Sequence, residues 1–196
     1  PEFRDTSEGG DGFVVGEIDV SVESAVDWVS NHDIEVPADV RVFAPSMLDM
    51  VMRGKYQRKL ARLTERVVQD GERLLDLGAG VNFLSMYACK LQGSTHVVAQ
   101  EDNASRTVIA DSIFERNAFD FGERYAQSNI QIVHKDDPKK TIAAIDALIA
   151  DVKPDVVRIS YEELGSGFLA QINFGSAKRV ALVGNAAREF HGQTAK

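Results

Sequence analysis

The chain has 196 residues, of which 44% are hydrophobic and 27% charged, values typical of a single globular domain. This composition excludes a collagen-like or disordered chain, and no apolar run approaches the roughly 20 residues of a membrane-spanning helix. The net charge of −8 argues against a nucleic-acid-binding surface and favours a small-molecule enzyme. The single cysteine, Cys89, cannot form an internal disulfide, so we expect a reducing, cytoplasmic location.

The chain divides into four predicted segments. Residues 71–184 alternate between strands and helices and form the predicted core. Residues 13–70 are predicted to be an N-terminal extension of strands and helices. Residues 1–12, which begin with a Pro-Glu-Phe sequence typical of a cloning site, and residues 185–196 are expected to be a loose lead-in and a polar tail.

The N-terminal extension is predicted to contain two extended segments, at residues 13–22 and 36–43, with a short helix between them. A long helix begins near Ser46 and continues to about Val67, because its apolar residues recur every three or four positions. Its other positions are rich in arginine and lysine, which indicates a solvated face. A docking patch for an acidic or phosphorylated substrate is the alternative.

From residue 73 onward, predicted strands alternate with helices of about 10 to 15 residues, which is typical of parallel strands joined by right-handed crossovers. The sequence therefore predicts a doubly wound, mainly parallel α/β sheet of the Rossmann-like type. The predicted strands are residues 73–77, 96–100, 130–134, 155–160 and 179–183. Four helices are predicted between these strands: one ending near residue 91, one from 104 to about 117, one beginning at 138 and one that includes Phe168, Leu169 and Ile172. The second is expected to bury Val108, Ile109, Ile113 and Phe114. The third is expected to turn Ile142, Ile145, Leu148 and Ile149 inward.

The strongest local signal lies between the first of these strands and its helix, where the sequence reads Asp-Leu-Gly-Ala-Gly-Val-Asn-Phe from Asp76. Glycines there allow a tight turn close to a ligand, and the helix N-terminus supplies free N–H groups. The next predicted strand is followed by Glu101, whose carboxylate could accept hydrogen bonds from ribose hydroxyls at the same sheet edge. The sequence therefore predicts a nucleotide-like cofactor.

Two cofactor classes compete for this turn. The dinucleotide fingerprint requires a glycine five positions after the first one, where this chain has Phe83. The S-adenosylmethionine pattern has an acid two positions before the first glycine, as Asp76 is, and glycines at steps of two, with Asn82 in the third place. Asparagine tolerates unusual backbone angles, so the spacing favours S-adenosylmethionine over a nicotinamide-dependent oxidoreductase. A glycine turn that binds no nucleotide is the remaining alternative.

Four runs of sequence together resemble the FkbM family, over about residues 50 to 183. They are Gly54-Lys55-Tyr56, Leu74-Leu75-Asp76-Leu77-Gly78-Ala79-Gly80, Val97-Val98-Ala99-Gln100-Glu101 and Pro154-Asp155-Val156-Val157-Arg158-Ile159. The members of that family are class I S-adenosylmethionine-dependent methyltransferases that typically O-methylate hydroxyls of saccharides and natural products. The resemblance implies that this chain does the same.

The resemblance also implies roles for the matching residues. Asp76 and the turn Gly78-Ala79-Gly80, with Asn82 after it, would lie by the amino-acid end of the cofactor. Glu101 would bind the ribose. Asp102 and Asn103 would lie near the adenine, with His134 and Asp136 along its other edge. Glu162 would be the retained carboxylate of the motif after the fourth strand, as a base or substrate ligand.

Five positions depart from the family's pattern: Asn82 replaces a glycine, Ser160 an acid, Glu163 a glycine, Gln57 a common glutamate and Ala104 a frequent proline. The first three favour a second hypothesis, in which the chain is a catalytically degenerate relative that serves as a binding or scaffold protein. No metal site is predicted, because the Asp136-Asp137 pair lacks partner ligands. The expected partner is a small-molecule or glycan hydroxyl substrate, and not nucleic acid or membrane.

The class I methyltransferase sheet normally ends with two further strands, one of them antiparallel. Only residues 184–196 follow the fifth predicted strand, so we expect an abbreviated sheet. Either the segments near residues 14–20 and 36–43 replace the missing strands, or the fifth strand is left as an exposed edge. In the second case a homodimer could cover that edge.

Overall fold

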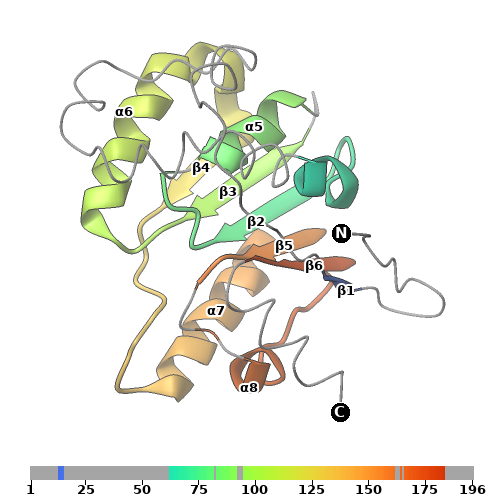
Figure 1. Ribbon diagram of the computed structural model, residues 1–196, viewed down its shortest axis with the longest axis vertical. Coiled ribbons are helices and arrows are strands. Elements are labelled where there is room, and N and C mark those ends of the chain that lie inside the picture. Colours follow the sequence, from blue (N-terminus) through green and yellow to red (C-terminus); the bar gives the residue numbers. More distant parts are fainter. Residues whose placement is uncertain are drawn as a thin grey trace, which may run out of the picture.

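The computed structural model describes residues 13–15, 62–81, 83–91, 95–161, 164 and 166–183. The predicted segments at 23–30 and 36–43, the polar tail and most of the long N-terminal helix lie outside these residues. The described chain forms a six-stranded sheet in the order β1-β6-β5-β2-β3-β4, in which every neighbouring pair is parallel (Figure 1). The prediction of a parallel, Rossmann-like α/β sheet is confirmed.

Four of the five predicted core strands are present within one residue of their expected bounds, and the helix predicted to end near residue 117 continues to residue 121. The strands are β1 (Phe13–Val15), β2 (Arg73–Leu77), β3 (His96–Gln100), β4 (Tyr125–Ser128), β5 (Val156–Ile159) and β6 (Arg179–Leu182). The helices are α5 (Phe83–Leu91), α6 (Ala104–Phe121), α7 (Pro138–Val152) and α8 (Ser166–Leu169), with a 3₁₀ turn at Gly122–Arg124. Residues 62–67 are also helical.

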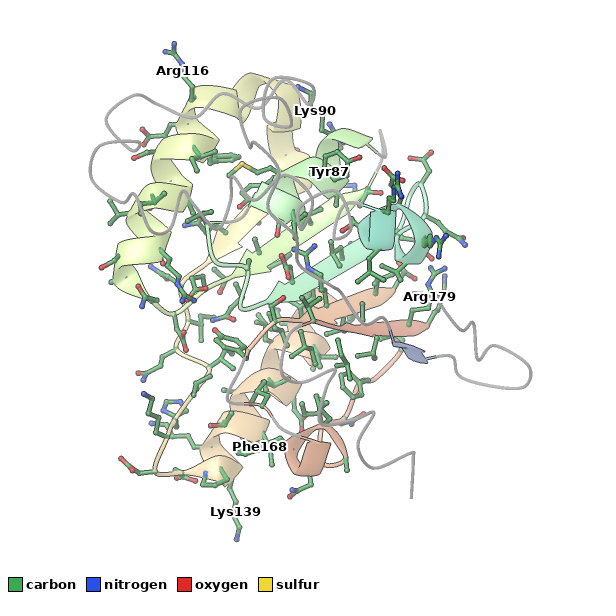
Figure 2. All side chains as sticks on the ribbon, viewed as in Figure 1. Tyr87, Lys90, Arg116, Lys139, Phe168 and Arg179 are labelled. Atoms are coloured by element: carbon green, nitrogen blue, oxygen red, sulfur yellow. The ribbon has the colours of Figure 1, made fainter. Side chains whose placement is uncertain are left out.

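The helices cover both faces of the sheet, with α5 and α6 on one face and α7 and α8 on the other (Figure 1). Successive strand residues point to opposite faces, so Leu74 belongs to the core under α5 and α6, whereas Leu75 belongs to the core under α7. Leu63 joins the first cluster, and Phe168 packs against the second (Figure 2). The central strands are buried on both sides, which is why they are apolar runs.

The third core strand is not where the sequence predicted it. We expected it at residues 130–134, but β4 is Tyr125–Ser128, directly after α6 and the 3₁₀ turn. The register explains the difference, because Ser128 pairs with Gln100, the last residue of β3, and the ladder ends there. Residues 130–134 keep a buried Ile132, which produces a strand-like alternation without a strand partner.

Two helix predictions also need correction. Val108 is 65% exposed although we expected it in the core; at roughly 100° per residue it lies on the side of α6 opposite Ala110 and Ile113, which are buried. The last predicted helix is shorter than expected, because α8 ends at Leu169. Ile172 lies beyond the helix but is buried, as predicted.

The N-terminal strand lies at one edge of the sheet. β1 pairs in parallel with β6, with Val14 opposite Ala181, so part of the N-terminal extension covers the strand that would otherwise form an exposed edge. This agrees with the first of the two expected arrangements for residues 13–15, whereas the segment at 36–43 lies outside the described residues. Within the described residues, no helix combines the length and the apolar character needed to cross a bilayer.

Candidate functional site

The candidate site lies where the direction of the chain through the sheet reverses. From β2 the chain proceeds outward to β3 and β4, and it then returns to form β5 and β6 on the other side of β2. Ligands of open parallel sheets bind at such a point, beyond the carboxyl ends of the strands. The loops after β2, β3 and β5 meet there (Figure 1).

The glycine turn (residues 78–80) follows β2 and is held against β3. The N–H groups of Gly78 and Ala79 both donate to the carbonyl of Gln100, at 3.0 and 2.9 Å. Gly78 and Gly80 have positive φ angles of 74° and 65°, which favour glycine at both positions. A Cβ on Gly78 would also lie 3.1 Å from the nitrogen of Tyr161, whereas one on Gly80 would meet nothing within 4 Å.

Glu101 lies directly behind this turn. Its Oε2 accepts a hydrogen bond from the Gly80 N–H at 2.8 Å, and its Oε1 accepts one from the Asn103 N–H at 2.9 Å. Arg106 Nη1 is 3.6 Å from Oε2. Glu101 is only 1% exposed, and this burial raises the pKa of its carboxyl despite the opposing effect of the two N–H donors.

Asp76 is fully buried and bound to protein partners. Arg158 donates from Nε to Asp76 Oδ1 at 2.8 Å and from Nη2 to Oδ2, and the hydroxyl of Ser85 also donates to Oδ2. Arg158 Nη1 donates further to Thr64 Oγ1 at 3.2 Å. This ion pair joins β2, β5, α5 and the helical residues 62–67 beneath the glycine turn.

The sequence indicates that each of these two charges needs a partner, and the register of the sheet decides which partner it is. Asp76 and Arg158 are the buried charged residues of β2 and β5, and a buried charge requires a partner. The two strands are neighbours, and the register places Asp76 directly opposite Arg158.

The two residues after Glu101 organise the surrounding loops. Asp102 Oδ2 accepts hydrogen bonds from the N–H groups of Ile132 and Val133, at 3.3 and 3.1 Å. Asn103 Oδ1 accepts one from the N–H of Arg106 at 3.2 Å, so Asn103 is the N-terminal cap of α6. Asp102 thus ties the segment after β4 to the end of β3.

The other predicted site residues are placed less closely. His134 is half-buried and follows an irregular segment rather than a strand; its N–H donates to Thr141 Oγ1 at 2.9 Å. Asp136 is exposed in the turn before α7. Asn82 and Glu162 lie outside the described residues.

Two residues that the sequence analysis did not single out connect these loops. The hydroxyl of Tyr161 donates to Gln100 Oε1 at 2.8 Å, and Gln100 Nε2 donates to the carbonyl of Ile130 at 2.7 Å. Burial and the nearby carboxylates of Asp102 and Glu101 raise the pKa of Tyr161 well above its usual range. Its phenol therefore stays protonated and acts as a donor. Among the described residues, no three acidic, histidine or cysteine side chains are grouped to hold a metal ion.

No family model matches the chain, and no curated protein matches it. Among solved structures, it is similar to precorrin-6y C5,15-methyltransferase from Geobacter metallireducens GS-15, with 16% identity and a TM-score of 0.44 over 62% of this chain and 59% of that one. The C-terminal domain of precorrin-6Y C5,15-methyltransferase from Rhodobacter capsulatus is 19% identical, with a TM-score of 0.38 over 52% of this chain and 47% of that one. An S-adenosylmethionine-dependent O-methyltransferase from Thermotoga maritima is 16% identical, with a TM-score of 0.43 over 65% of this chain and 44% of that one.

The chain spans between 44% and 59% of the length of these three proteins. Each of them is described as a methyltransferase. At such identities and TM-scores an activity does not transfer from one protein to another, so a function for this chain has to rest on its own residues.

Proposed function

We propose that this chain binds S-adenosylmethionine at the glycine turn and transfers its methyl group to a hydroxyl of a saccharide or natural product, as the resemblance to the FkbM family implies. The observation that carries the proposal is the hydrogen bond between the Gly80 N–H and the Glu101 carboxylate. It brings a positive-φ glycine turn and a buried acid together at the point where α/β sheets bind nucleotides.

Glu101 retains the capacity to bind ribose hydroxyls. A carboxylate offers about four lone-pair positions, and the N–H groups of Gly80 and Asn103 use two of them. The remaining positions can accept from a vicinal diol. Because the side chain is 1% exposed, binding must displace atoms that cover it, and the affinity is reduced by the cost of that displacement.

Methyl transfer to a hydroxyl is a displacement at the sulfonium methyl, for which the protein aligns the two reactants and accepts the hydroxyl proton. Tyr161 is unsuited to accept that proton, because its phenol is already a donor to Gln100 and its pKa is raised. We assign the proton acceptor to Glu162, the next residue in the chain. We assign His134 to the edge of the adenine, and it is the alternative base.

The competing candidate is a methyltransferase-like protein that binds the cofactor without turnover. Ser160, which stands where the family has an acid, favours it, because a site without that carboxylate lacks one group that could hold a substrate hydroxyl. The two candidates share the cofactor site and differ in whether the bound methyl group is transferred.

Calorimetric titration with S-adenosylmethionine and with S-adenosylhomocysteine tests the cofactor assignment. We expect micromolar binding, reduced at least tenfold in Glu101→Ala, since one buried charged acceptor is worth about 1.4 kcal/mol or more. The matched control is Glu115→Ala, which removes an exposed glutamate from α6. Absence of binding at millimolar ligand would refute the assignment.

A methyl-transfer assay on a panel of saccharide and polyol acceptors then separates the two candidates. We expect turnover that falls in Glu162→Gln while cofactor affinity is unchanged. Binding without turnover on any acceptor would favour the non-catalytic protein.

A further inference from the structure

We infer that Gln100 is a positioning residue for the cofactor site, through which the loops after β2, β4 and β5 are held together. The inference rests on the proposed function for its effect on cofactor affinity. Gln100 itself is fully buried and is the last residue of β3.

The main chain of Gln100 holds the loop after β2. Its carbonyl accepts from the N–H groups of both Gly78 and Ala79, at 3.0 and 2.9 Å. The next residue, Glu101, accepts from the Gly80 N–H. The end of β3 therefore binds all three N–H groups of the glycine turn.

The side chain of Gln100 holds the other two loops. Its Nε2 donates to the carbonyl of Ile130 after β4, and its Oε1 accepts from the hydroxyl of Tyr161 after β5. Tyr161 passes close over Gly78, where an added Cβ would lie 3.2 Å from the tyrosine Cγ. The carboxamide thus joins two loops whose strands are separated by β2 and β3.

A carboxamide satisfies both partners at once at any pH, whereas a carboxylate does not. A main-chain carbonyl can only accept, so the Gln100 NH₂ group must face Ile130, which leaves the oxygen for the Tyr161 hydroxyl. An ionised glutamate at this position would face the Ile130 carbonyl with an acceptor and leave it without a donor. A protonated glutamate would restore the donor and therefore the bridge.

The charge state of such a glutamate depends on the titratable groups around it. Among the described residues, Tyr161 after β5 bonds directly to Gln100, and the carboxylates of Asp102 and Glu101 after β3 lie close enough to act on Tyr161. The two carboxylates and the burial both disfavour another negative charge. The bridge in Gln100→Glu should therefore be intact at acid pH and broken at alkaline pH.

The test is the affinity of Gln100→Glu for S-adenosylmethionine at about pH 5.5 and about pH 8.5, each relative to the unsubstituted protein at the same pH. We expect binding about tenfold or more weaker at the higher pH, the size expected when a buried group loses its hydrogen-bond partner. At the lower pH we expect recovery to within about threefold. An equal loss of affinity at both pH values would overturn the inference, since it would indicate that Gln100 has a packing role only.

Two further variants control this measurement. Gln127→Glu makes the same change on β4, where Gln127 Nε2 donates to Asp111 at 2.7 Å outside the site, and it should leave cofactor affinity unchanged. Tyr161→Phe removes the hydrogen bond to Gln100 Oε1, one of the two bonds of the bridge. It should weaken cofactor binding, relative to the unsubstituted protein, by the same factor at both pH values. An unchanged affinity in Tyr161→Phe would count against the bridge.

Hydrogen exchange of the ligand-free protein provides a readout that does not require cofactor. In Gln100→Glu the amides of Ile132 and Val133 should exchange faster than in the unsubstituted protein at the higher pH and at the same rate at the lower one. If the unsubstituted protein binds no S-adenosylmethionine, the proposed function fails, and the exchange rates alone decide the role of Gln100. Unchanged exchange at both pH values would refute it.

Discussion

The buried ion pair between Asp76 and Arg158 makes a quantitative prediction. In Arg158→Met the guanidinium is replaced by an apolar side chain, and the Asp76 carboxylate retains only the Ser85 hydroxyl among its described side-chain donors. Asp76 is fully buried and Arg158 is 3% exposed, so water does not replace the lost partner. The same reasoning applies to Asp76→Asn, in which the Arg158 charge is left unpaired.

The expected cost depends on this burial. Removing one partner of a buried ion pair destabilises a protein by about 3 to 5 kcal/mol, a large share of a total stability of about 5 to 15 kcal/mol. For a chain of this length, that loss corresponds to a decrease in Tm of roughly 6 to 20 °C. The double variant Asp76→Asn with Arg158→Met contains neither buried charge. Its loss of stability should be smaller than the sum of the losses in the two single variants, by at least about 1 kcal/mol.

Urea denaturation of the four proteins at neutral pH measures this coupling. Arg116→Met is the control, because Arg116 points away from the sheet on the exposed side of α6 (Figure 2), and it should change stability by no more than about 0.5 kcal/mol. Strictly additive losses in the double variant would refute the reasoning, since they would mean that the two charges do not depend on each other.

Three other predictions concern the glycine turn, the acid behind it and the cysteine. Gly78→Ala should destabilise the protein more than Gly80→Ala in thermal denaturation. Both variants incur the penalty of about 1 to 2 kcal/mol for a left-handed backbone, but only Gly78→Ala adds a Cβ within 3.1 Å of Tyr161. Equal losses of stability in the two variants would contradict this close contact. Burial raises the pKa of Glu101 in the folded protein above its ordinary value near 4.5. The free energy of unfolding, relative to that of Glu101→Gln, should therefore fall as the pH rises from 4.5 through the folded-state pKa. Urea titrations at several pH values measure this difference, and a rise over the same pH interval would contradict the prediction. Cys89 is fully buried and its thiol pKa is raised, so a thiol reagent at neutral pH should label it only after unfolding, and rapid labelling of the folded protein would disprove its burial.

Local pattern was enough to predict much of the fold. The apolar runs of β2, β3, β5 and β6 and the helical period of α7 are properties of short segments, and the structure has them at nearly the predicted residues. The proximity of the glycine turn to Glu101 was also predictable, because the turn ends one strand, the acid comes directly after the next, and neighbouring parallel strands present their carboxyl ends at one edge.

Contacts between residues distant in sequence could not be read from local pattern. Residues 130–134 alternate like a strand, yet the ladder of β3 ends at Gln100, and the sheet is completed by the less apolar Tyr125–Ser128. The partner of Asp76 is 82 residues away, and Gln100 meets Tyr161 at a separation of 61 residues. Each of these contacts depends on which strands become neighbours and in which register. That is a property of the assembled sheet, because a buried polar group takes whichever partner the packing brings to it.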